Sequence, residues 1–246
     1  MKKNQVNLIS SKEKKNRKKL NLLFNNCPIN EDEKLNNLGL FIKRQLLSRI
    51  LFMHMLYKKI IDIHGVVIEF GVRWGQNLAL LQNFRGIYEP FNYNRKILGF
   101  DTFEGFPSVS DKDKNFKKGD YGVTKEYEKY LQKILNYHES ECPISHIKKF
   151  EIIKGNAIKK LKDYLKNNPE TIIAFAYFDF DLYEPTKKCL ELIKGHLTKG
   201  SIIGFDELNV KEFPGETIAL KEVFGLGKYK IKRSPISSLQ SYIIFE

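Results

Sequence analysis

The pattern of hydrophobic residues changes along the chain from a helical period to short apolar runs. Apolar side chains recur at helical spacing over residues 38–62, and the pattern stops at His64 and Gly65, which predicts a helix that ends there. From Val66 onward, runs rich in β-branched and aromatic residues alternate with longer helical stretches, as in parallel βαβ units. The runs expected to form strands are residues 66–72, 96–101, 150–154, 172–180, 201–205, 229–232 and 241–245.

The last two predicted strands are joined by residues 233–240, which are too few for the helical crossover that parallel neighbours need. We therefore expect them to pair antiparallel. A mostly parallel sheet that ends in such a hairpin separates class I methyltransferases from dinucleotide dehydrogenases, so we expect an α/β, Rossmann-like fold with a seven-stranded sheet. Residues 104–143 hold no clear strand and one predicted helix at 125–137, and we expect them to form a lid and acceptor insertion.

The charge distribution separates an amino-terminal arm from this fold. The 246-residue chain has a formal net charge of +13, and residues 1–20 hold eight Lys or Arg and one acid. About half of the excess charge therefore lies outside the expected fold. We expect residues 1–37 to form a basic, partly disordered arm and residues 38–246 to form one methyltransferase domain with a helical extension at its start.

Cysteine usage and the lack of long apolar runs bear on the compartment. The three cysteines are widely spaced and form no C-x-x-C pair, which fits a reducing cytoplasm. No apolar segment followed by a small-residue cleavage site indicates a secretory signal. The richest apolar run, residues 46–61, is interrupted by charges and falls short of the roughly 20 residues of a membrane span. We expect a cytoplasmic protein without a membrane span.

Residues 66–77 resemble a cofactor-binding segment, with a buried strand, a glycine turn and the start of a helix. Gly71 allows close approach of a ligand to the backbone, and the helix directs free N–H groups at it. The missing third glycine and the missing G-K-[ST] argue against a dinucleotide fingerprint and a P-loop. Asp101 ends the next strand, where an acid can bind ribose hydroxyls. Glu69 either binds the ammonium of a methionine tail or is a solvent-facing acid at a strand end.

Acidic residues lie at the ends of the fourth and fifth predicted strands. Asp179 and Asp181 follow one strand and, by strand alternation, should face the same side, while Asp206 and Glu207 follow the other. Several carboxylates in one cleft repel each other unless a cation joins them, and an all-oxygen set suits Mg²⁺. The absence of an N-P-P-Y-like turn favours a hydroxyl acceptor over a planar amine. The alternative is that the acids only cap strands and helices, as Asp181 would cap the helix beginning near Pro185.

Five ordered segments carry a family resemblance. Residues 42–61, 67–72, 99–107, 179–186 and 206–207 resemble, in consistent order, the macrocin O-methyltransferase family, which includes the mycinamicin and novobiocin sugar O-methyltransferases. The likeness covers residues 38–226. It implies a class I fold, S-adenosylmethionine as methyl donor, a magnesium-type metal and a deoxysugar hydroxyl as acceptor.

The resemblance also implies functional positions. Those that would line the cofactor are Glu69, Gly71, Asp101, Thr102 and Phe103, with Gly155, Asn156 and Ala157 facing its adenine. Those that would bind the metal are Asp179, Asp206 and Glu207, and Asp181 takes the position of the general base. The family more often has Asp-Asp where this chain has Asp206 and Glu207, and the longer glutamate side chain makes the third ligand depart from the pattern.

The leading hypothesis is thus an S-adenosylmethionine-dependent, metal-assisted O-methyltransferase acting on a nucleotide-linked or glycoconjugate sugar. An RNA methyltransferase is suggested by the basic charge, but no RNA-binding module is recognisable, and we expect no nucleic-acid partner. A non-catalytic S-adenosylmethionine-binding protein is a further alternative, against which the retained acids argue. The apolar helix near the amino terminus could serve a homodimer interface.

Overall fold

The computed structural model describes residues 10–113 and 115–246, and it separates into two compact units with the division after Ile50. The first unit contains α1 (Ser11–Asn25), α2 (Glu31–Asn36), the 3₁₀ helix η1 (Leu38–Phe41) and the start of α3 (Arg44–Lys58). A capping box begins α1, because Ser10 Oγ accepts the Glu13 N–H and Glu13 Oε2 accepts the Ser10 N–H. The described part of the basic arm is therefore helical, although α1, α2 and η1 bury no side chain.

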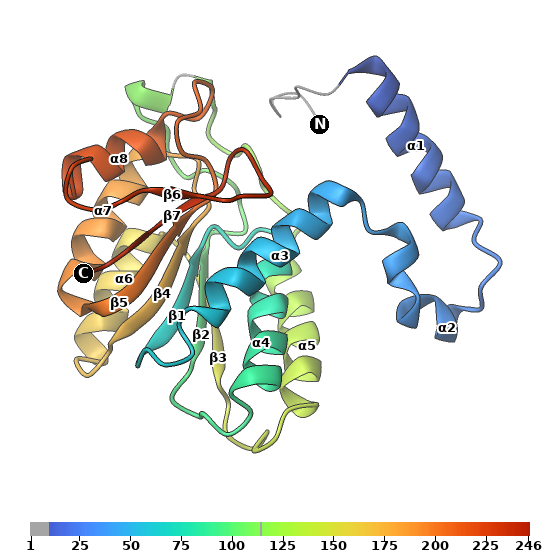
Figure 1. Cartoon of the computed structure of the whole chain (residues 1–246), viewed down its shortest axis with the longest axis horizontal. Helices are drawn as coiled ribbons and strands as arrows, with labels where there is room; N and C mark the ends of the chain where they lie inside the picture. The colour runs from blue at the N-terminus through green and yellow to red at the C-terminus, as the bar shows by residue number, and fades with distance from the viewer. Residues whose placement is uncertain (1–9, 114) are drawn as a thin grey trace. The chain divides into compact units, whose positions relative to one another are not determined.

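A seven-stranded sheet with the order β3-β2-β1-β4-β5-β7-β6 forms the second unit (Figure 1). The first five strands are parallel, and β7 runs antiparallel to both β5 and β6. The strands are β1 (Val66–Phe70), β2 (Ile97–Asp101), β3 (Phe150–Lys154), β4 (Ile173–Phe178), β5 (Leu197–Phe205), β6 (Lys232–Arg233) and β7 (Ser241–Ile244). This arrangement confirms the predicted Rossmann-like methyltransferase fold with its antiparallel end.

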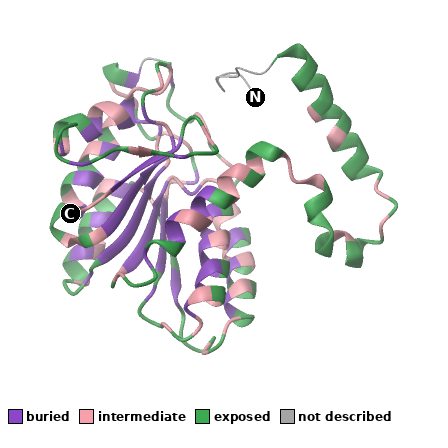
Figure 2. Cartoon of the chain, viewed as in Figure 1, coloured by how far each residue is buried: buried purple, intermediate pink, exposed green. Residues whose placement is uncertain are grey.

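Helices cover both faces of the sheet because its strands are apolar on both faces (Figure 2). One core cluster joins α6 (Ala157–Asn167), α7 (Tyr183–Ile193) and α8 (Gly215–Val223) to one face. The other cluster joins the buried side of α3 together with α4 (Gln76–Tyr88) and α5 (Tyr127–Ser140) to the opposite face. The short helices η2 (Asp111–Asp113) and η3 (Lys194–His196) complete the described elements.

Helix α5 shows that the predicted insertion is not a lid along its whole length. Leu131 and Leu135 are each 1 % exposed and belong to the core cluster that includes α4. Glu139 lies between two buried cations, 2.9 Å from Arg85 Nη2 and 2.5 Å from Lys149 Nζ. The second half of residues 104–143 is therefore part of the folded core, because an apolar helix face and a buried ion cluster fix it to α4 and β3.

The first half of the insertion is attached to the opposite side of the sheet. Asp113 is buried and accepts the N–H of Tyr183, the first residue of α7, at 3.0 Å. Sequence analysis gave this capping role to Asp181 as an alternative, whereas the carboxylate at this N–H comes from the insertion. The Phe116 ring lies 5.3 Å from Phe213 near the start of α8. These contacts hold the insertion near the carboxyl ends of β4 and β5.

Candidate active site

The glycine turn after β1 lies directly beside the end of β4. Gly71 has φ +87°, and a Cβ added there would lie 2.0 Å from the Asp179 carbonyl oxygen, so no other residue fits without a shift of the backbone. Gly75 has φ +78°, and its added Cβ would meet Leu131 of α5 at 2.3 Å. The two glycines therefore allow the turn to pack tightly between α5 and the strand end that carries the first acid.

Asp101 holds the turn from the neighbouring strand. Its Oδ2 accepts the Arg73 N–H at 2.7 Å, and its Oδ1 accepts the Phe103 N–H at 2.5 Å. Burial raises the pKa of Asp101, although these main-chain donors favour the ionised form. Each carboxylate oxygen has a further lone pair that can accept a hydroxyl hydrogen. The position expected to bind ribose thus combines a fixed orientation with remaining acceptor capacity.

The other expected cofactor residues lie around the same edge. Glu69 is 1 % exposed, and its Oε1 accepts a hydrogen bond from Asn77 Nδ2, so it is not the solvent-facing acid of the alternative interpretation. Phe103 is buried, and Thr102 Oγ1 donates to the Gly105 carbonyl at 2.7 Å. Asn156 caps α6 by accepting the Lys159 N–H, which is a structural role for that residue.

Three acids come together at the ends of β4 and β5. Carboxylate oxygens of Asp179, Asp181 and Glu207 all lie within 4.8 Å of one another. Strand alternation does not produce this, since β4 ends at Phe178 and Asp181 has a left-handed φ of +60°. A non-glycine residue in this conformation marks a turn that its surroundings must hold in place.

Asp206, expected as a metal ligand, lies beside this group with hydrogen bonds of its own. It is 4 % exposed, and its Oδ1 accepts from Tyr177 Oη at 2.5 Å and from Gln240 Nε2 at 3.2 Å. The structure thus groups Asp181 with the acids at 179 and 207, and gives Asp206 partners on β4 and next to β7. Sequence analysis did not identify either partner, since both are separated from Asp206 by about thirty residues.

Glu216 is a buried residue of the site that sequence analysis missed. It lies on α8 with no exposed surface, and its Oε1 accepts the Phe180 N–H at 3.3 Å while its Oε2 accepts the Glu207 N–H at 3.2 Å. One carboxylate thus joins the two turns that carry the acids. Burial, followed by the charges of Asp181 and Asp179, raises the pKa of Glu216 well above its usual value.

Asp179, Asp181 and Glu207 form an acidic cluster whose oxygen donors fit a hard divalent cation. Burial and then the charges of Asp206 and Asp181 raise the pKa of Glu207 well above its usual value. Its Oε2 is buried and has no hydrogen-bond partner among the described residues. A Mg²⁺ ion would reduce the repulsion among these oxygens and would coordinate the buried carboxylate oxygen that lacks a partner.

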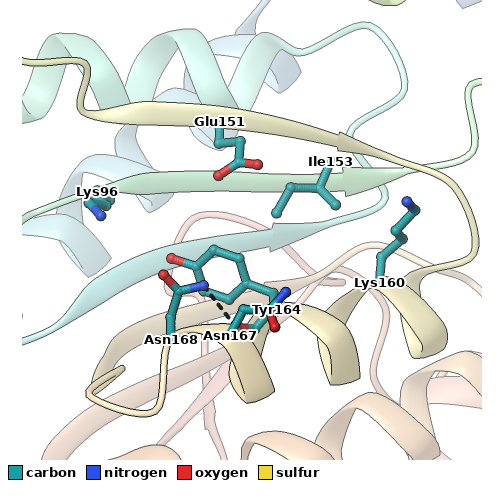
Figure 3. A pocket seen from close by; sticks show the side chains of 7 residues that line it. All are labelled: Lys96, Glu151, Ile153, Lys160, Tyr164, Asn167 and Asn168. Atoms are coloured by element: carbon teal, nitrogen blue, oxygen red, sulfur yellow. Dashed lines mark hydrogen bonds between the residues drawn. The ribbon is translucent and has the colours of Figure 1, made fainter.

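A separate hollow lies between β3 and α6 (Figure 3). It has a volume of about 250 Å³ and is lined by polar side chains that include Lys96, Glu151, Lys160 and Tyr164. None of the residues that sequence analysis placed at the cofactor or the metal lines it. The hollow is therefore separate from the candidate site at the carboxyl ends of the strands.

Fold and site together define a class I methyltransferase. The sheet has the strand order of that class, and one edge of it carries the glycine turn with Asp101 and the acids after β4 and β5. No protein-family model and no curated protein sequence matches the chain. Among solved structures, the crystal structure of CalS11, calicheamicin methyltransferase, is 41% identical with a TM-score of 0.93 and covers 96% of this chain and 94% of that one.

Two further structures support the relationship. The apo structure of CalS11, described as TDP-rhamnose 3′-O-methyltransferase, an enzyme in calicheamicin biosynthesis, is 38% identical with a TM-score of 0.86 and covers 96% of both chains. The O-methyltransferase NovP shares the fold, at 18% identity, a TM-score of 0.62 and coverage of 80% of this chain and 79% of that one. The chain belongs to the O-methyltransferase family of CalS11, within the class I S-adenosylmethionine-dependent methyltransferases, and is an enzyme that methylates oxygen.

Proposed function

We propose that this enzyme transfers the methyl group of S-adenosylmethionine to a hydroxyl group of a nucleotide-linked sugar. The observation that carries the proposal is the 41% identity to CalS11 over 96% of the chain, because CalS11 acts on TDP-rhamnose. The acidic turns after β4 and β5 support the proposal, because their carboxylates are groups that can accept the proton of a hydroxyl acceptor. A sugar in a glycoconjugate is the nearest alternative acceptor.

The cofactor is proposed to lie along the ends of β1, β2 and β3. Asp101 would accept the ribose hydroxyls and Glu69 the ammonium of the methionine tail, with Gly71 leaving room for the backbone to approach. The remaining residues proposed to line the cofactor are Thr102, Phe103, Gly155, Asn156 and Ala157.

Chemistry is proposed at the acidic cluster. The acceptor oxygen forms a bond to the methyl carbon as the carbon–sulfur bond breaks, and the electron pair of that bond stays on sulfur to give S-adenosylhomocysteine. Asp181 accepts the proton of the acceptor hydroxyl, because an alcohol is a poor nucleophile while protonated. Asp179, Asp206 and Glu207 are proposed to hold Mg²⁺ or a similar ion, which when bound lowers the pKa of a hydroxyl group.

The test is the release of S-adenosylhomocysteine from a panel of TDP-sugars, other nucleotide sugars and glycans, with and without EDTA. We expect turnover with at least one nucleotide sugar and loss of turnover after chelation. Turnover with glycans alone would show that the acceptor is a glycan and not a nucleotide-linked sugar. Full activity in EDTA would show that the reaction does not require a metal. Methylation of RNA and not of sugars would overturn the proposal.

We further propose that the amino-terminal unit associates with a second copy of the chain and does not bind nucleic acid. Leu22, Leu35 and Leu40 are 61 %, 71 % and 65 % exposed. Exposed leucines in one short segment are candidates for burial in a protein interface. No helix among the described residues has the length and apolar character to cross a membrane. The three free cysteines agree with a proposed cytoplasmic location.

A further inference from the structure

Arg73 is the one positive charge in the four segments that follow β1, β2, β4 and β5 at the active-site edge. These segments, residues 69–77, 101–106, 179–183 and 206–209, contain seven acids and this single arginine. The seven acids are Glu69, Asp101, Glu104, Asp179, Asp181, Asp206 and Glu207. Among the side chains of these segments, only Arg73 can attract a ligand group with a negative charge.

The Arg73 side chain lacks the partner that buried arginines of this protein have. Arg85 and Arg95 are each 1 % exposed, and each forms an ion pair with a glutamate, at 2.9 Å and 3.0 Å. Arg73 is half-buried, and its Nε is buried without a hydrogen-bond partner among the described residues. A buried donor without an acceptor is costly, so the site is built for a group that supplies one.

The position of Arg73 is fixed from two sides. Its backbone has a left-handed φ of +50°, and its N–H donates to Asp101 Oδ2. Its guanidinium lies over the ring of Tyr121, 5.0 Å from the centroid. Burial and then the charges of Asp181 and Glu207 raise the pKa of Tyr121, which agrees with a location beside the acidic cluster. The guanidinium therefore lies between the glycine turn and the acids.

We propose that Arg73 binds the carboxylate of the methionine tail of S-adenosylmethionine, an inference that rests on the proposed cofactor site. The tail carries an ammonium and a carboxylate, and the many acids can satisfy only the ammonium. A guanidinium offers a planar fork of N–H donors that matches a carboxylate. A phosphate of the acceptor is the other anion available, but Arg73 lies within the cofactor turn itself and its backbone is bonded to the ribose-binding acid.

The test compares S-adenosylmethionine with decarboxylated S-adenosylmethionine, which keeps the adenosine, the sulfonium and the ammonium. Calorimetry with Arg73→Gln should show a Kd for S-adenosylmethionine raised about 10- to 100-fold, the effect of losing a charge-assisted pair. The Kd for the decarboxylated compound should change less than about twofold, since it has no carboxylate to lose. Arg73→Lys should be intermediate, because it keeps the charge without the fork.

Lys125→Gln is the matched control, since it removes an exposed positive charge from the insertion and should change neither Kd. Tyr121→Phe should retain the affinity for S-adenosylmethionine and Tyr121→Leu should lower it, because only the former keeps the ring under the guanidinium.

Equal losses for both compounds in Arg73→Gln would show that Arg73 only supports the turn and would overturn the proposal. An unchanged Kd with a raised KM for the acceptor would assign Arg73 to an acceptor phosphate. Failure of the unsubstituted enzyme to bind S-adenosylmethionine would overturn the cofactor assignment itself.

Discussion

Asp179 and Asp181 lie in one acidic cluster but are expected to respond differently to amide substitution. Asp181→Asn should lower the rate of S-adenosylhomocysteine release by about 10²- to 10⁴-fold, the share of general base catalysis, and added Mg²⁺ should not restore it. Asp179→Asn should also abolish turnover at low Mg²⁺, but excess Mg²⁺ should restore part of it because an amide oxygen is still a ligand. Initial rates over a Mg²⁺ series check both expectations.

Asp163→Asn, on the exposed face of α6, is the control and should leave the rate unchanged. Restoration of Asp181→Asn by Mg²⁺ would move that residue from the role of base to the role of ligand. This outcome has a structural basis, because Asp181 belongs to the group within 4.8 Å and Asp206 has hydrogen bonds to Tyr177 and Gln240.

Glu216 tests whether the backbone of the two acidic turns must be held together. Glu216→Gln keeps the size of the side chain but leaves one acceptor oxygen for two N–H groups, those of Phe180 and Glu207. We expect Mg²⁺ affinity to fall about 10- to 100-fold, as for other residues that orient metal ligands. Amide exchange at Phe180 or Glu207 should also become faster in the metal-free protein.

Glu222→Gln provides the comparison on the same helix, because Glu222 is partly exposed and pairs with Lys112 and Lys187. It should change neither the Mg²⁺ affinity nor the two exchange rates. If Glu216→Gln behaves in the same way as this control, the buried carboxylate has no part in holding the turns.

At the scale of elements, α5 depends on a buried ion cluster. Glu139→Gln removes the one carboxylate between Arg85 and Lys149 and leaves both cations buried without it. The free energy of unfolding should fall by about 3 to 5 kcal/mol, the cost of leaving a buried charge unpaired. Urea unfolding measures this loss. Glu141→Gln is the control, because Glu141 is the exposed residue directly after α5, and its free energy of unfolding should lie within about 0.5 kcal/mol of that of the unsubstituted protein.

A normal stability of Glu139→Gln would mean that water or relaxation compensates the two cations. In that case the apolar contacts of Leu131 and Leu135 would be sufficient to hold α5. Gly75 would then still lie against the side chain of Leu131.

The elements that could be predicted from the sequence are those with a local signal. The runs that became β1, β2 and β4 are apolar and buried almost throughout, and β3 and β5 each contain a shorter apolar run, so composition located these strands within a few residues. The hairpin was predicted from the length of its connection, although β6 is only two residues long. The helix at Ser11–Asn25 had a signal in the spacing of Ser10 and Glu13, a capping box that the basic composition concealed.

Residues that act across the fold had no such signal. Glu216 is separated from Phe180 by 36 residues and from Glu207 by nine, and nothing in its neighbourhood in the sequence indicates a site. Asp113 caps α7 from 70 residues away. The acids at strand ends were predictable because parallel strands end at one edge, while the residues that orient them depend on tertiary packing.

At the scale of the whole molecule, the chain combines a buried α/β unit with an amino-terminal unit whose three leading helices have no buried side chain. Deleting residues 1–37 should therefore leave the free energy of unfolding of the second unit within about 1 kcal/mol, since none of the described residues removed, 10–37, is buried. The affinity for S-adenosylmethionine should also be retained, because all proposed cofactor residues follow Val66.

The last prediction separates the apolar and the basic character of this amino-terminal unit. Replacing Leu22, Leu23, Leu35 and Leu40 with serine should convert a dimer to a monomer in sedimentation velocity, since these exposed leucines are proposed to be covered by a second copy. Replacing the six basic residues of α1 with glutamine should leave the dimer intact, since the proposed interface is apolar, and neither this variant nor the unsubstituted protein should be retained on nucleic acid at physiological salt. A monomer in the unsubstituted protein, or a dimer that survives the serine substitutions, would contradict the proposed interface.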